Sequence, residues 1–303
     1  LYYTLRSMYM KYRLLLLAAA LIWGFAFVAQ VVGMDTVGPF TFNGVRFVIG
    51  SLALLPFLYF HREGKSPLPT SIPLWAAFLM VGIPLFLGAT LQQVGLQYTT
   101  ASKASFLTAN YLLMVPITGL FLGQPLLRNH LIGAILAMAG VYFISITSDF
   151  SISLGDGLML LCALSFTVQI HMLNYLTQRF SPVLLSAGQF MVTGVLNLML
   201  AFLFETPDLA GLEGAAWPIL YTGILSTSVA YTLQAVGQKY MPPTEASMIL
   251  SMEMVFGGLS GLFFLDESFT LRQTIGVIAM TLGVFLSQIP SPVLLSGLRR
   301  RNQ

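Results

Sequence analysis

Charged residues are scarce in this 303-residue chain, because only 8% of its residues are Asp, Glu, Lys or Arg. An average soluble domain carries about 25% charged residues. A soluble globule of this length could not cover its surface with so few solvated groups, since 56% of the residues are hydrophobic. The composition therefore nearly excludes a soluble enzyme, excludes a disordered chain, and indicates a protein embedded in a lipid bilayer.

Residues and motifs for several other chemistries are also missing. The one cysteine, Cys162, lies inside an apolar run and can form no internal disulfide. His171 has no His, Cys or carboxylate nearby at metal-ligand spacing, and no Walker-type phosphate loop or catalytic triad is visible. The basic residues behind the net charge of +3 are scattered singly. We therefore expect no enzymatic activity, no cofactor or metal, and no nucleic-acid partner.

Long apolar runs make up most of the chain. A helix needs about 20 apolar residues to cross a bilayer, and polar or Pro/Gly-rich segments divide the sequence into ten such runs. We place them near residues 12–32, 40–60, 73–96, 103–123, 130–147, 156–177, 182–204, 215–238, 244–265 and 271–290. The sequence thus predicts an all-α integral membrane protein with ten transmembrane helices.

The Lys and Arg residues are concentrated on one side of the predicted membrane. With a cytoplasmic N-terminus, only Lys103 and Arg272 fall on the outer side. Eleven fall on the cytoplasmic side, namely Arg6, Lys11, Arg13, Arg62, Lys65, Arg128, Arg179, Lys239, Arg299, Arg300 and Arg301. This positive-inside bias predicts that both termini are cytoplasmic. We expect a multi-pass protein of a bacterial-type inner (plasma) membrane.

The sequence repeats itself at an offset of 142 to 143 residues. Residues 90–92 and 232–234 both read Thr-Leu-Gln, and residues 119–121 and 261–263 both read Gly-Leu-Phe. Each repeat carries five predicted spans. Because five is odd, the second repeat must lie upside down relative to the first, which is typical of secondary transporters with a site where the halves meet. The alternative is a repeat that only stabilises a membrane scaffold.

A series of short motifs occurs in a fixed order within this two-repeat frame. They are Trp23-Gly24, Pro39, Arg46-Phe47, Ala104-Ser105, Glu253 and Leu265-Asp266-Glu267. Their order resembles the EamA-type family of the drug/metabolite transporter superfamily over about residues 12–290. The resemblance implies a 5+5 inverted-topology repeat around a central cavity, and export of metabolites, amino acids or drugs. It assigns residues 1–150 to the first repeat and residues 151–303 to the second, which ends in a basic tail.

Departures from the family pattern leave the substrate open. Met254 follows Glu253 where the family often has Pro, and Gln124 follows Gly123 where the first repeat often has Glu. The counterpart of Arg46 in the second repeat is Gln189.

Glu253 is the main candidate for coupling transport to protons. It lies near the middle of the predicted span 244–265, where a charge costs about 3 kcal/mol. Burial favours the neutral form of a carboxyl. A carboxyl that titrates near the working pH could exchange a proton for substrate. The alternative is a protonated side chain that hydrogen-bonds a neighbouring helix and never titrates.

Arg46 is the only basic residue within a predicted span. Its guanidinium stays protonated, and three roles are open to it. It could bind a substrate carboxylate or phosphate, neutralise Glu253 directly or through water, or extend to the outer interface.

Uncharged polar and aromatic residues in the spans predict a cavity between the repeats. Trp23, Phe27 and Gln30 share one helical face, and Gln92 and Gln234 are repeat-equivalent amides. The further candidates are Asn43, Gln93, Asn110, Tyr111, Gln169 and Tyr231. For each residue the alternative is a helix–helix hydrogen bond. The set is suited to a zwitterion or an amphipathic metabolite.

Helix-weakening residues predict hinges. Pro116 falls on Gly258 at the offset of 142, and Pro84 adds a break in the third span. We expect the spans to bend at these residues, which would allow the halves to rock or gate.

These features together predict a secondary active transporter that exports small amino-acid-like or amphipathic metabolites by alternating access, with proton coupling through Glu253. A passive facilitator and an importer are the nearest alternatives. A non-transporting sensor or assembly protein is less favoured, because it would normally carry an extramembrane module. Gly-x-x-x-Gly spacings, such as Gly257 with Gly261, permit close helix contacts and leave a homodimer open.

Overall fold

The computed structural model describes residues 2–60, 70–123, 128–145 and 152–287. Every regular element within these ranges is a helix, so the all-α prediction is confirmed for the part of the chain that is described. The predicted loop residues Arg62 and Lys65, the motif residue Gln124 and the basic tail at 299–301 lie outside the described residues.

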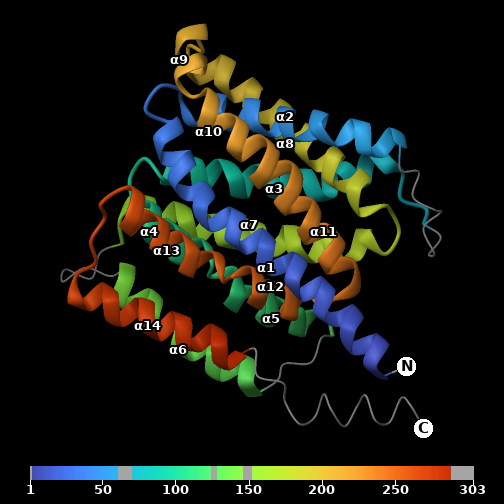
Figure 1. Cartoon of the computed structure of the whole chain (residues 1–303), viewed down its shortest axis with the longest axis vertical. Helices are drawn as coiled ribbons and strands as arrows, with labels where there is room; N and C mark the ends of the chain where they lie inside the picture. Colours follow the sequence, from blue (N-terminus) through green and yellow to red (C-terminus); the bar gives the residue numbers. More distant parts are fainter. Residues whose placement is uncertain (1, 61–69, 124–127, 146–151, 288–303) are drawn as a thin grey trace.

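The helices follow one another along the chain with short connections (Figure 1). In the first half they are α1 Tyr2–Gly33, α2 Pro39–Phe60, α3 Leu74–Gly95, α4 Ala101–Thr108, α5 Tyr111–Phe121 and α6 Arg128–Ser145. In the second half they are α7 Leu154–Thr177, α8 Pro182–Phe204, α9 Leu209–Gly214, α10 Ala216–Leu220, the π-helix η1 Tyr221–Ala230, α11 Tyr231–Tyr240, α12 Pro243–Leu250, α13 Glu253–Phe264 and α14 Leu271–Ser287.

Eight helical stretches of the described residues are long and apolar enough to cross a membrane. The helical stretches Leu131–Ile144 and Leu271–Leu286 are also apolar but shorter. They fall where the sequence predicts the fifth and tenth spans. The chain is therefore a multi-pass helical membrane protein, with eight spans that meet the length expected for a bilayer.

Polar side chains and prolines fix several helix starts. Thr100, Ser153 and Ser181 accept hydrogen bonds from backbone N–H groups in the first turns of α4, α7 and α8, which satisfies donors that a helix end leaves free. Pro182 and Pro243 begin α8 and α12, where the missing N–H of proline has no cost. The helix boundaries thus follow from capping as much as from hydropathy.

The fourth and ninth predicted spans are each broken into two helices. Helix α4 ends before residues 109–110, and α12 ends before residues 251–252, exactly 142 residues later. We expected the bends at Pro116 and Gly258, but these residues lie inside the uninterrupted helices α5 and α13. Pro84 likewise lies within the single helix α3. The location of the predicted breaks was therefore wrong.

Side-chain bonds to the backbone explain where α4 and α12 end. Asn110 Nδ2 donates to the carbonyls of Phe106 and Leu107, and Ser251 Oγ donates to the carbonyl of Met248. Such local bonds compete with the helical ladder. They end the first half-helix of each span at equivalent positions.

The eighth predicted span is composite, because α10, η1 and α11 run on from one another. A π-helix of ten residues is rare, and such widened segments are frequent at functional sites. The short helix α9, in the connection before this span, was not predicted.

The packing places the two halves of the chain against each other. Helix α2 packs on α8, α3 packs on α7 and α8, and α1 packs on α13, η1 and α11. Helices α6 and α14 pair with each other and lie at one side of the bundle (Figure 1). The core between the halves includes Phe47, Phe190 and Tyr231, whose rings contact one another.

Candidate functional site

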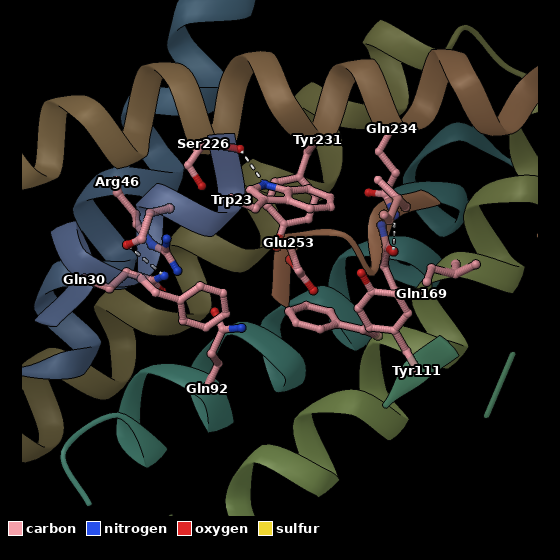
Figure 2. A pocket seen from close by; sticks show the side chains of 15 residues that line it. Trp23, Gln30, Arg46, Gln92, Tyr111, Gln169, Ser226, Tyr231, Gln234 and Glu253 are labelled. Atoms are coloured by element: carbon pink, nitrogen blue, oxygen red, sulfur yellow. Dashed lines mark hydrogen bonds between the residues drawn. The ribbon is translucent and has the colours of Figure 1, made fainter. Parts of the chain in front are cut away.

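A small internal cavity lies where both halves contribute helices (Figure 2). Its lining residues are Trp23, Ala26, Phe27, Gln30, Arg46, Gln92, Tyr111, Phe166, Gln169, Ile170, Ser226, Tyr231, Gln234, Leu250 and Glu253. The volume open to water is about 30 Å³, which holds one or two water molecules. The cavity is thus nearly closed in this conformation.

Most of the predicted cavity residues meet at this site. Of the predicted set, only Asn43, Gln93 and Asn110 do not line the cavity. Gln93 Nε2 donates to the Gln30 carbonyl, and Asn110 bonds the end of α4, so both tie helices together. For these two residues the helix–helix alternative describes the geometry.

Asn43 lies behind the cavity wall and holds Arg46. Its Nδ2 donates to the Ala89 carbonyl on α3 at 2.9 Å, and its Oδ1 accepts from Arg46 Nε at 2.9 Å. The Arg46 guanidinium also lies over the rings of Phe42 and Phe47, at 5.6 and 4.9 Å from their centres. Arg46 is only 3% exposed. The predicted extension of this side chain to the membrane interface is therefore wrong.

Arg46 and Glu253 face the same cavity without forming an ion pair. The ion pairs among the described residues are Lys103–Asp156 at 2.6 Å and Arg13–Glu245 at 3.6 Å. The direct pair considered from the sequence is thus not made here.

Glu253 is the first residue of α13, and Tyr111 is the first residue of α5. They are repeat equivalents at the offset of 142 and lie beside each other at the cavity (Figure 2). Both are buried, and neither Tyr111 Oη nor Glu253 Oε1 has a hydrogen-bond partner among the described residues. A helix start is a favourable place for a carboxylate, because the backbone N–H groups there carry partial positive charge.

A row of amides forms the other end of the cavity. Gln234 Nε2 donates to Gln169 Oε1 at 3.3 Å, and Gln169 Nε2 donates to Gln189 Oε1 at 3.1 Å. Gln189 is the repeat counterpart of Arg46. The cavity is therefore asymmetric, with a guanidinium at the first-half end and neutral amides at the second-half end.

Aromatic rings form one wall of the cavity. Trp23 packs against Tyr231 with ring centres 4.5 Å apart, and Trp23 Nε1 donates to the Ser226 carbonyl in η1 at 3.1 Å. Sequence reasoning did not select Ser226, because the contact uses its backbone. It named Phe166 and Ile170 only as repeat counterparts of Trp23 and Phe27, and that offset was the available signal.

His171 lies outside the cavity, as its Nε2 contacts Thr118 Oγ1 at 2.9 Å and the Val115 carbonyl at 3.2 Å. These contacts join α7 to α5. Within the described ranges, no group of three or more His, Cys, Asp or Glu residues could hold a metal ion.

The fold and the site define a multi-pass helical membrane protein with a polar, aromatic-walled cavity between its two halves. The sequence matches the model of the EamA-like transporter family over residues 10–146 and again over residues 153–288. The chain belongs to this family, within the drug/metabolite transporter superfamily, and is a transporter.

Curated relatives agree with this assignment. An "Uncharacterized transporter" of Archaeoglobus fulgidus is 34% identical, covering 88% of this chain and 82% of the relative. The "Uncharacterized transporter YoaV" of Bacillus subtilis is 24% identical, covering 91% and 96%. The "WAT1-related protein At3g02690, chloroplastic" of Arabidopsis thaliana is 27% identical, covering 88% and 67%. A solved crystal structure superposes with a TM-score of 0.73 at 18% identity, covering 92% of this chain and 98% of its own, which shows the fold alone.

Proposed function

We propose that this transporter exports small metabolites by alternating access and exchanges them for protons through Glu253. The observation that carries the proposal is a buried carboxyl, 4% exposed, with an unpartnered oxygen in a cavity between the halves. A carboxyl placed there can bind a proton or a substrate group in turn. The export direction comes from the family resemblance.

The proposed architecture has ten spans in a 5+5 inverted repeat, with residues 1–150 and 151–303 as its halves. Three observations support it. The family model matches the chain twice. The fourth and ninth spans break 142 residues apart. Helix α3 packs on α7 and α8, and its repeat counterpart, which includes η1, packs on α1 and α2. Exchanged contacts of this kind are expected when each half swaps one helix into the other.

The proposed location is a bacterial-type inner membrane with both termini in the cytoplasm. The distribution of Lys and Arg in the sequence supports this orientation. In that orientation, proton exchange would let the proton gradient drive substrate out of the cell.

Transport in vesicles of purified protein tests the proposal. Substrates are first chosen by their effect on thermal stability in detergent, because a ligand that binds the folded form raises it. Flux is then measured with and without an imposed pH gradient. Glu253→Gln keeps the size of the side chain but cannot exchange a proton. We expect it to lower gradient-driven accumulation at least tenfold and to leave exchange of labelled for unlabelled substrate measurable.

Glu213→Gln is the matched control, since Glu213 is exposed on α9 and outside the cavity. We expect this variant to behave as wild type. Gradient-driven accumulation that survives Glu253→Gln unchanged would remove the coupling role. Wild-type flux that ignores the gradient would indicate a passive facilitator, and accumulation in the opposite direction would indicate an importer.

A further inference from the structure

Arg46 is a buried cation without a counter-ion. It is 3% exposed and forms no ion pair among the described residues. Its Nε is bonded to Asn43, while no hydrogen bond of its two Nη atoms is found among the described residues. An unpaired charge in the membrane interior is costly, and contacts with the faces of two phenylalanines offset only part of that cost. A charge kept under these conditions calls for an anion that is present for part of the time.

We propose that Arg46, positioned by Asn43, binds the carboxylate of a small carboxylic acid carried by this transporter. The inference rests on the proposed function, because it takes the cavity to be the transport site. It names the chemical class of the substrate and the end of the cavity that receives its acid group.

The geometry fits a planar carboxylate. Asn43 is anchored to the Ala89 carbonyl on α3, so it fixes the Nε edge of the guanidinium. The remaining pair of nitrogens forms a fork that matches the two oxygens of a carboxylate. Figure 2 shows Arg46 near Gln30 and Gln92 at one end of the cavity, with Glu253 between this end and Gln234.

The charge at the site favours a single negative charge over a phosphate dianion. No second Lys, Arg or His lines the cavity. A dianion would keep one charge uncompensated in a site that excludes water, whereas a carboxylate and Arg46 balance.

The other polar atoms specify what accompanies the carboxylate. Gln30 Nε2 donates to the Ala26 carbonyl at 3.2 Å, which leaves Gln30 Oε1 buried and unpartnered. Glu253 Oε1 is also buried and unpartnered. Both are acceptors, so the acid that fits best carries a hydrogen-bond donor, such as an ammonium or a hydroxyl group, near its carboxylate.

The cavity gives the bound acid one orientation. Gln189 occupies the counterpart position of Arg46 in the second half and is bonded to Gln169. The second-half end therefore offers neutral amides and no cation.

Paired ligands test the inference on the wild-type protein. The acids are alanine, lactate and benzoate, each compared with its primary amide, and inorganic phosphate is included. We expect at least one acid to raise the thermal stability of the detergent-solubilised protein, its amide to be at least tenfold weaker, and phosphate to have no effect. No stabilisation by any acid, or equal stabilisation by acid and amide, overturns the inference.

Variants then assign the effect to the two residues. Arg46→Gln copies the second-half residue and should lower the affinity for the acid at least tenfold without changing the affinity for the amide. Arg46→Lys should lose most of the preference for the acid, because an ammonium lacks the fork. Asn43→Ala should reduce the ratio of acid to amide affinity several-fold with Arg46 still present, which a loss of stability alone would not do.

Arg272→Gln is the matched control, since Arg272 lies over the ring of Tyr142 outside the cavity. Acid binding that persists in Arg46→Gln overturns the inference. The outcomes also separate the two proposals. Gradient-driven flux that needs Glu253 but does not discriminate acid from amide leaves the proposed function standing alone. Arg46-dependent acid binding without flux supports the site and removes the proposed function.

Discussion

Buried polar atoms without partners gather around the cavity. They include Gln30 Oε1, Tyr111 Oη, Gln234 Oε1 and Glu253 Oε1. Each buried polar group left unsatisfied costs about 1–3 kcal/mol. A fold that served only stability would have replaced such groups with apolar ones or given them partners. Their retention at one site is the residue-level mark of a place that water and ligand occupy in turn.

Replacing Tyr111 with Phe should therefore not destabilise the protein. The Tyr111 hydroxyl has no partner, so Tyr111→Phe removes an unsatisfied group and keeps the ring. We expect the free energy of unfolding to stay the same or rise by about 1 kcal/mol. Thermal unfolding in detergent measures it, and the stabilisation by bound ligand should fall in the same variant.

Tyr221→Phe is the comparison for that prediction. Tyr221 Oη donates to the Ile22 carbonyl at 3.1 Å, so this change removes a hydrogen bond that is made. It should lower the free energy of unfolding by about 1 kcal/mol. Equal destabilisation by both substitutions would show that the Tyr111 hydroxyl has a partner in solution.

The sequence predicted most of the cavity because polar residues are conspicuous in apolar spans. Glu253 and Arg46 stand out as single charges, and the amides stand out in the same way. It did not predict that Asn43 supports Arg46 from outside the cavity, since that depends on the position of the Ala89 carbonyl on another helix. Leu250 lines the cavity but is indistinguishable from its apolar neighbours in the sequence.

At the scale of helices, the predicted breaks were displaced by about one and a half turns. Proline and glycine weaken a helix on average, yet α5 continues through Pro116 and α13 through Gly258. The breaks instead coincide with the backbone bonds of Asn110 and Ser251. Whether a polar side chain bonds its own backbone depends on what else it can reach. Local propensity could not decide this.

The pair formed by α6 and α14 depends on close contact at glycine. A Cβ added at Gly276 would meet the backbone carbonyl of Gly140, whereas a Cβ added at Gly157 would meet nothing within 4 Å. We expect Gly276→Ala to destabilise the protein by about 1–3 kcal/mol. Gly157→Ala, in the first turns of α7, should stabilise it by up to about 1 kcal/mol. Thermal unfolding of the two variants checks both signs.

Ligand affinity should be the same in both glycine variants, because no residue of α6 or α14 lines the cavity. A loss of affinity in Gly276→Ala would mean that this helix pair supports the site at a distance. Stabilisation by Gly276→Ala would contradict the close approach of the two helices.

At the scale of the whole molecule, the sequence predicted the order and approximate ends of the spans. Hydropathy reports length and apolar character, so it located all ten runs, of which eight reach bilayer length as helices. It did not report the π-helix η1 or the helix α9. The packing of α3 on α7 and α8 is a long-range outcome, and only the repeat offset hinted at it.

Three acidic side chains of the second half bind helix ends of the first half. Glu205 accepts from the backbone N–H groups of Phe40 and Thr41, each at 2.8 Å. Glu267 accepts from Ala101 N at 2.8 Å and Ser102 N at 2.9 Å. The third contact is the ion pair of Asp156 with Lys103. All three lie in connections that the sequence places on the outer side, so alternating access requires that they open.

Weakening one of these contacts should expose that end of the molecule. Glu267→Gln replaces two charge-assisted bonds with weaker ones, and each such bond contributes about 1.5–3 kcal/mol. Because 1.4 kcal/mol is a factor of ten, the open population should rise at least about tenfold. The reporter is Ala101→Cys in a Cys162→Ala background, as Ala101 is fully buried in the closed form. The labelling rate with a water-soluble maleimide in detergent measures the change.

The adjacent carboxyl supplies the control, because Asp266 is exposed and makes no hydrogen bond to α4. Its substitution, Asp266→Asn, removes the same charge from the same connection and should leave the labelling rate unchanged. Equal acceleration in both variants would assign the effect to net charge at this end. No acceleration in Glu267→Gln would mean that Glu205 and the Lys103–Asp156 pair hold the halves together without it, so that the three contacts must be removed together before the cavity opens.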